Sequence, residues 1–167
     1  MYHEGCSLWR EIQSFPGILL TMNTSKGFRE HAHMADWELK VWAADLPGLL
    51  EQAALGMYTL SGTRLEAAPR QARHLSVYGI DAESLLVRFL GELLWLGELE
   101  NVAFDRFELS VSGETETLDL HHSLHLSADL EGAAIAGLAK EIKAVTYHNL
   151  AVRQTGNGLE ARIVFDV

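Results

Sequence analysis

Residues 141–148, which read Glu-Ile-Lys-Ala-Val-Thr-Tyr-His, form the clearest strand pattern of this chain. Apolar and polar side chains alternate along them, as in a β-strand that buries one face. The alternation predicts that one side carries Ile142, Ala144 and Thr146, and the other side Glu141, Lys143, Val145 and Tyr147. The acid and the lysine at positions 141 and 143 would therefore share one strand face.

A second apolar strand is predicted over residues 159–167, and it contains Asp166 immediately before the terminal Val167. A carboxylate in an apolar strand costs free energy unless it is paired, binds a cation or faces solvent at an exposed chain end. Far upstream, Asp36 precedes another predicted strand, a position where aspartate is also common as a turn former. Because hard cations prefer oxygen ligands, these acids near strand ends, with Lys143 nearby, predict a candidate cation site.

The composition limits the class of protein. With 167 residues, 48% of them apolar, the chain suits one compact domain with a sizeable core. A net charge of −10 argues against a general RNA- or DNA-binding surface, because neutralising phosphates requires clustered Lys and Arg. The single cysteine, Cys6, rules out an internal disulfide and a cysteine-based zinc site, and fits a reducing cytoplasm. No apolar run approaches the roughly 20 residues of a membrane span.

Residues 1–25 are predicted to lie outside the domain. They carry large apolar side chains, such as Trp9 and Phe15, without the period of a helix or strand. They also lack the long apolar core of a signal peptide. We interpret them as a poorly ordered extension or a mis-called start, with Met22 as the natural beginning, and we place the domain over residues 26–167.

Hydrophobic periodicity predicts two helices among many strands. Asp45 is the expected N-cap of a helix over residues 46–60, and Asp81 caps a second helix with an apolar stripe over residues 85–96. The predicted strands are 28–32, 37–43, 73–79, 102–112, 116–127, 140–153 and 159–167. Because strands follow one another rather than alternate with helices, we expect a single α+β domain: two principal helices packed on a mainly antiparallel sheet.

The histidines offer a weaker metal hypothesis. His31 and His33, or His121 or His122 with His125, are spaced so that two imidazoles could share a strand face and bind a transition metal. Ordinary solvated histidines explain the same spacing. No Ser-His-Asp order, phosphate-binding glycine loop or nucleotide fingerprint is present, so the motifs do not predict an enzyme.

Residues 33–36, His-Met-Ala-Asp, resemble the His-Thr-Ala-Asp signature of the archease family, with Met34 in place of the threonine. The later elements resemble the family in the same order: the leucine-rich helix over 85–96, the strand over 141–148 and the terminal Phe165-Asp166-Val167. The resemblance covers residues 28–167. The substitution at Met34 removes a hydroxyl beside Asp36 but leaves the carboxylate unchanged.

The resemblance implies a small cytoplasmic, chaperone-like protein that activates an RtcB-type RNA ligase in tRNA splicing or RNA repair. Such a protein promotes guanylylation of the ligase and its multiple turnover, without catalysis or direct nucleic-acid binding of its own. The family pattern implies a divalent cation, calcium first and Mg²⁺ or Mn²⁺ as alternatives, held by Asp36, Asp166 and Val167, with His33 beside these ligands. Glu141 and Lys143 become the partner-facing residues.

Two other classes of function stay open at the level of sequence. One is a stand-alone metal-dependent hydrolase that uses Asp36 and Asp166 around an ion, with His33 as the base. The other is a plain protein-interaction adaptor whose acids are merely solvated. Hydrolysis by the purified protein, or stimulation of a ligase, would distinguish the three.

Overall fold

The computed structural model describes residues 25–32, 37–113 and 124–167. The elements are, in chain order, β1 (Gly27–Ala32), β2 (Trp37–Ala43), α1 (Leu46–Leu60), β3 (Arg64–Gly79), α2 (Ala82–Glu100), β4 (Val102–Gly113), β5 (Leu124–Gly137), β6 (Ala144–Thr146), β7 (Arg153–Thr155) and β8 (Gly158–Asp166). The interpretation of residues 1–25 as an extension and the predicted roles of His33 and Asp36 fall on residues outside this description, apart from the exposed Ser25.

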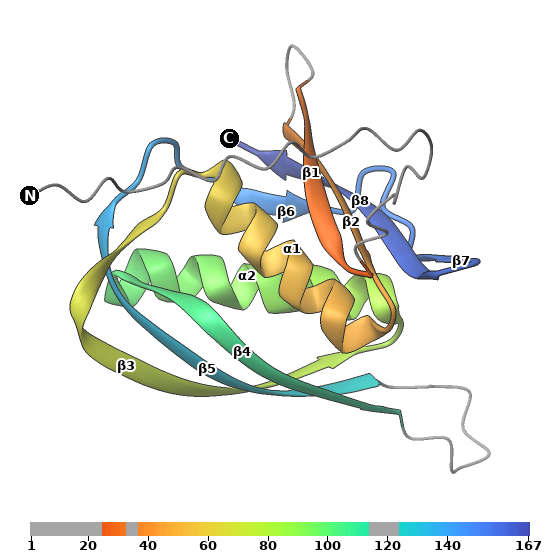
Figure 1. The fold of residues 1–167 in the computed structure, drawn as a ribbon, viewed down its shortest axis with the longest axis horizontal. Helices are drawn as coiled ribbons and strands as arrows, with labels where there is room; N and C mark the ends of the chain where they lie inside the picture. The colour runs from red at the N-terminus through yellow and green to blue at the C-terminus, as the bar shows by residue number, and fades with distance from the viewer. Residues whose placement is uncertain (1–24, 33–36, 114–123) are drawn as a thin grey trace, which may run out of the picture.

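The described strands form two antiparallel sheets that enclose the two helices. A five-stranded sheet has the order β1-β2-β8-β6, with β7 also paired to β8, and a three-stranded sheet has the order β3-β5-β4. Figure 1 shows the long strands β3, β4 and β5 curving around one side of α1 and α2, while the five-stranded sheet lies on the other side. The α+β prediction is confirmed, with the correction that the strands divide into two sheets rather than one.

Local sequence signals determine where the helices begin and end. Asp45 Oδ1 accepts a hydrogen bond from the Gly48 amide at 2.9 Å, and α1 ends before Gly62, which has a left-handed φ of 64°. At α2, Asp81 and Ser84 form a reciprocal capping box, with distances of 2.7 and 3.1 Å. The hydrogen bonds from Ser84 lower the pKa of the Asp81 carboxyl. Both caps match the sequence prediction.

The core lies between the helices and both sheets. The apolar stripe of α2 is fully buried at Leu85, Leu86, Phe89, Leu90 and Leu93. On the central strand β8, Ile163, Val164 and Phe165 are buried, whereas Arg162 just before them is exposed. Each such large apolar side chain stabilises the fold by about 1.5–3 kcal/mol relative to an exposed position. This core holds the end of β8 in one place.

Three strand predictions were wrong in their bounds. β3 begins at Arg64 rather than at residue 73. The sequence prediction missed its first half because that half is exposed, polar and irregular, with register shifts between Leu65 and Arg70. β5 runs on to Gly137, beyond the predicted end at residue 127. Small residues in the second half of β5 obscure the strand pattern in the sequence. A Cβ on Gly132 would lie 1.9 Å from the carbonyl oxygen of Ala103, so close strand packing requires glycine there.

The predicted strand over residues 140–153 is interrupted. Only Ala144–Thr146 pairs as β6, and Arg153–Thr155 forms β7. A turn separates them, in which the Leu150 amide donates to the Tyr147 carbonyl at 3.2 Å and Asn149 has a left-handed φ of 54°. Asparagine tolerates that conformation because its side chain is short and polar.

Candidate cation and partner-binding site at the end of β8

Lys143, Asp166 and Val167 meet at the end of the central strand, and we call this group the β8-end site. The Lys143 amide donates to the Asp166 carbonyl at 2.8 Å. The Lys143 Nζ atom donates to the Val167 carbonyl oxygen at 3.3 Å. The Val167 side chain packs against the core, so the chain end is held beside the lysine. The structure thus brings together the Lys143 ammonium and the chain terminus, which lie 24 positions apart in sequence.

The strand register explains this meeting. Phe165 lies opposite Trp37 of β2 on one side and Val145 of β6 on the other. Lys143 precedes β6 by one residue, and Asp166 follows Phe165. Because β6 and β8 are antiparallel, the residues just before Val145 and just after Phe165 lie at the same end of the sheet.

The predicted cation ligands are described only in part. Asp166 is exposed, and its carboxylate has no hydrogen-bond or ion-pair partner within the described ranges. Across those same ranges, no group of three or more His, Cys, Asp and Glu side chains is placed to hold a metal ion. Asp36 and His33 lie outside them. The described residues place oxygen atoms of Asp166 and Val167 at this strand end, and a cation held by Asp36, Asp166 and Val167 stays a prediction.

Glu141 and Lys143 are exposed on either side of the buried Ile142, but they do not share a strand face. That prediction was wrong because pairing begins only at Ala144. The predicted faces also reverse within the strand, since Ala144 is exposed and Val145 packs against the core. Alternation in sequence locates a face only where the residues are paired along their whole length.

The segment that carries Lys143 is fixed to its surroundings before the strand begins. The amides of Ala139 and Lys140 both donate to the Ser61 carbonyl at the end of α1, at 3.0 and 3.1 Å. The Lys140 Nζ atom lies 4.0 Å from the centre of the Trp37 ring, a cation–π contact. These contacts hold residues 138–143 between α1 and the five-stranded sheet.

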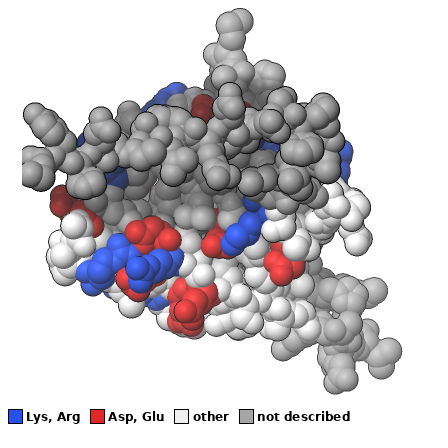
Figure 2. Space-filling view, viewed as in Figure 1, with Lys and Arg blue, Asp and Glu red and all other residues white. Residues whose placement is uncertain are grey.

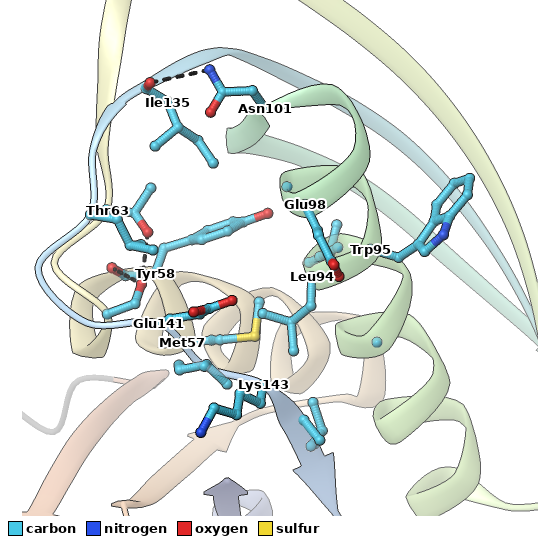
Figure 3. Close-up of a pocket in the computed structure, with 18 of the residues that line it drawn as sticks. Met57, Tyr58, Thr63, Leu94, Trp95, Glu98, Asn101, Ile135, Glu141 and Lys143 are labelled. Atoms are coloured by element: carbon cyan, nitrogen blue, oxygen red, sulfur yellow. Dashed lines mark hydrogen bonds between the residues drawn. The ribbon is translucent and has the colours of Figure 1, made fainter. Parts of the chain in front are cut away.

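A cavity of about 490 Å³ opens beside this segment, and we call it the α2 cavity. Its walls come from the end of α1, the second half of α2 and residues 138–145, and they include Met57, Tyr58, Leu94, Trp95, Glu98 and Glu141. Figure 3 shows the Glu141 carboxylate turned toward Met57, whereas the Lys143 ammonium points away from the cavity. Sequence reasoning missed this cavity, because its walls join segments far apart in the chain.

Several charged side chains on the three-stranded sheet pair with charges of opposite sign. Arg70 pairs with Asp105 and, at 3.0 Å, with Glu131, and Arg73 pairs with Glu100 at 2.5 Å. The Arg70 guanidinium lowers the pKa of the Asp105 carboxyl. Figure 2 shows basic and acidic side chains side by side rather than in patches of one sign.

Histidines on that sheet form two separate pairs. Ser76 Oγ lies 2.8 Å from His125 Nε2, and His74 Nδ1 lies 2.7 Å from Asp129 Oδ1. Tyr78 stacks on His125 with ring centres 4.5 Å apart. Because the serine and the aspartate contact different imidazoles, these side chains do not form a catalytic triad. The predicted pairing of His125 with His121 or His122 concerns residues outside the description.

Two helices enclosed by two antiparallel sheets, with a charged site at the end of the central strand, define a class of small α+β domain. The sequence profile of the archease protein family matches residues 28–167, and this chain belongs to the archease family. Protein archease of Methanosarcina acetivorans is 31% identical over 137 residues, covering 81% of this chain and 92% of that protein. The archease of Methanothermobacter thermautotrophicus is 28% identical, covering 85% and 99%.

Solved structures agree with this assignment. The solution structure of Methanobacterium thermoautotrophicum protein 1598 matches with a TM-score of 0.65 and 26% identity, covering 84% of this chain and 99% of that one. The crystal structure of a Thermotoga maritima archease, described as a possible chaperone, has a TM-score of 0.54 at 19% identity, covering 83% and 94%, and supports the fold alone. Within the described residues, no helix has the length and apolarity to cross a membrane.

Proposed function

We propose that this protein is a cytoplasmic, non-catalytic activator of an RtcB-type RNA ligase, which promotes ligase guanylylation and multiple turnover in tRNA splicing or RNA repair. Membership of the archease family supports the class of function. The observation that carries the proposal is the β8-end site, where a lysine and a carboxylate are exposed together beside the chain terminus. A small acidic protein with such a site suits encounter with a larger, basic RNA-binding enzyme.

The cation is part of this proposal. Asp36, Asp166 and Val167 would hold it, with calcium preferred and Mg²⁺ or Mn²⁺ as alternatives. Two observations support the fit: the Asp166 carboxylate is exposed without a described partner, and Asp36 is the chain neighbour of Trp37, which pairs with Phe165. When bound, a divalent ion would supply positive charge at this edge of the sheet. His33 would lie beside the ligands.

Lys143 and Glu141 have different roles in the proposal. The Lys143 ammonium is directed at the chain end, where it can contact a phosphate or carboxylate of the partner. Glu141 is turned toward the α2 cavity and contacts a different part of the same partner. Both side chains are presented by a segment that is fixed by Ser61 and Trp37, so little ordering is needed on binding.

A guanylylation assay tests the proposal directly. The cognate ligase is incubated with Mn²⁺, GTP and RNA ends, with and without this protein, and guanylylated ligase is followed over several rounds. We expect stimulation by wild type and its loss in Lys143→Ala. Arg153→Ala is the matched control, because Arg153 is an exposed cation on β7, which pairs with the opposite end of β8.

Failure of wild type to stimulate its cognate ligase would contradict the proposal. Hydrolysis of phosphoesters by the purified protein alone would instead support the hydrolase class, with His33 as the base. Binding to the ligase without any change in guanylylation would support the third class of function, a plain protein-interaction adaptor.

A further inference from the structure

The α2 cavity has the size and lining of a binding site. Pockets that enclose ligands or anchoring side chains span roughly 300–1,000 Å³ and are mainly apolar with a few polar groups. This cavity, at about 490 Å³, is lined mostly by apolar side chains such as Met57, Leu94, Ile135, Ile142 and Val145. An occupant would therefore bury apolar surface on all sides.

The apolar surface continues outside the cavity. Trp95 and Leu138, both on the rim, are 53% and 49% exposed. Large apolar side chains clustered around a concave site are typical of protein–protein interfaces, where an anchor enters the pocket and the rim covers its flanks. A small molecule enclosed by the cavity would leave this rim in water, so the rim favours a partner protein as the occupant.

Tyr58 lines the cavity, but its hydroxyl oxygen is not accessible from it. Its hydroxyl oxygen is buried and makes no hydrogen bond within the described part of the chain. Figure 3 shows the ring reaching from α1 toward Leu94 and Glu98 of α2. Burial raises the pKa of Tyr58, and the nearby Phe104 backbone offsets this only in part and outside hydrogen-bonding geometry. The hydroxyl stays protonated, and the cavity offers an occupant the apolar ring of Tyr58 rather than its polar tip.

The rim is acidic. Glu98 and Glu141 are exposed, and neither has an ion-pair partner among the described residues, whereas Glu51, Glu100 and Glu160 each pair with a cation. The Lys143 ammonium does not compensate them, because it is directed at the chain end. A basic residue beside the anchor would complement this rim.

We propose that the α2 cavity receives a large aromatic side chain, tryptophan in the first instance, flanked by a basic residue on the protein partner. The inference rests on the proposed function for the identity of that partner, the RNA ligase. The cavity and the β8-end site share the segment 141–145, so a partner that contacts Lys143 covers both.

A peptide titration tests the chemistry of the cavity. The probe is Ac-Lys-Trp-Lys-NH2, and the matched controls are Ac-Lys-Ala-Lys-NH2 and Ac-Glu-Trp-Glu-NH2, followed by amide NMR of the isotope-labelled full chain. We expect saturable shifts confined to the end of α1, the second half of α2 and residues 138–145. Each control peptide should bind at least about ten-fold more weakly than the probe. Equal binding of all three peptides, or no saturable shift at the cavity, would overturn the inference.

Variants locate the site without risking the fold. Gly91 lines the cavity within α2, and a Cβ there would meet no atom within 4 Å, so Gly91→Trp fills the cavity and also improves helix propensity. We expect it to abolish probe binding with unchanged spectra elsewhere. Trp95→Ala should weaken binding, whereas Leu99→Ala, an equally apolar exposed change on α2 outside the cavity, should not. Loss of binding in Leu99→Ala but not in Trp95→Ala would contradict the assigned site.

The ligase assay separates this inference from the proposed function. If wild type and Gly91→Trp stimulate the ligase equally, the cavity is not part of the interface and the inference fails while the proposed function stands. If the probe binds as expected but wild type gives no stimulation, the proposed function fails and the anchor site stands. Stimulation by wild type together with its loss in Gly91→Trp supports both.

Discussion

The end of the five-stranded sheet and the outer face of the three-stranded sheet treat charge in opposite ways. On the three-stranded sheet, Arg70 is shared between Asp105 and Glu131, and His74 contacts Asp129. Asp166 at the end of β8, and Glu98 and Glu141 at the α2 cavity, have no such partners among the described residues. A surface with compensated charges has little to gain from a charged partner, whereas an uncompensated one is prepared for it. This contrast supports the proposal that the partner contacts the uncompensated charges.

The largest expected effect on stability comes from removing the buried Phe165 side chain beside the β8-end site. Phe165 is buried between Trp37 and Val145, so Phe165→Ala should destabilise the protein by about 3–5 kcal/mol through lost burial and a new cavity. Chemical denaturation measures this. A loss below about 1 kcal/mol, the size typical of a random substitution, would show that the strand end is not held by the core.

The next effect is on activity with little change in stability. Asp36→Ala and Asp166→Ala should each abolish ligase stimulation, while unfolding free energy in metal-free buffer changes by about 0.5 kcal/mol or less. Removing one carboxylate loses a cation ligand but also relieves repulsion among the remaining acids. Guanylylation and thermal melting are measured together. Folded variants with full stimulation would show that these acids are merely solvated.

Asp81→Ala should destabilise the protein by about 1 kcal/mol at neutral pH, because the α2 capping box loses the carboxylate that accepts the hydrogen bond from the Ser84 amide. The folded protein holds the pKa of Asp81 below its ordinary value of 3.8. Its contribution is therefore complete above pH 3.8 and is lost as the pH falls through the lowered value. The difference between wild type and variant should shrink in acid, and a difference that grows there would contradict the cap.

Arg70→Ala tests the three-stranded sheet, where this arginine is paired with two acids. The ion pairs are solvent-exposed, so their loss should destabilise the protein only slightly, and less at high salt. Ligase stimulation should be unaffected. Because Asp105 owes its lowered pKa chiefly to Arg70, the carboxyl should titrate closer to its ordinary value in the variant, which NMR can follow. Lost stimulation would make this face part of the interface.

The smallest effect is expected at the N-terminus. A chain that begins at Met22 should melt within a few degrees of the full chain and stimulate the ligase equally, since residues 1–21 precede the family match at residue 28. Differential scanning calorimetry provides the measurement. A large loss of stability would show that Trp9 or Phe15 packs on the domain.

Sequence patterns predicted the elements whose signals are local. Both helix caps, at Asp45 and Asp81, and the short strands before α1 were predicted correctly, because capping and alternation depend on residues within a few positions. The first half of β3 and the second half of β5 were missed. Each forms because the other is there to pair with, despite polar residues in one and glycine and alanine in the other.

The sequence by itself determined the α+β class, the two capped helices and the resemblance to archeases, because these depend on local periodicity and on short motifs in a given order. Only the tertiary structure decided that Lys143 donates to the end of a chain 24 residues away, and that Tyr58, Trp95 and Glu141 surround one cavity. The physical reason is that strand pairing and helix packing set those distances. Neither alternation nor spacing along the chain encodes which segments become neighbours.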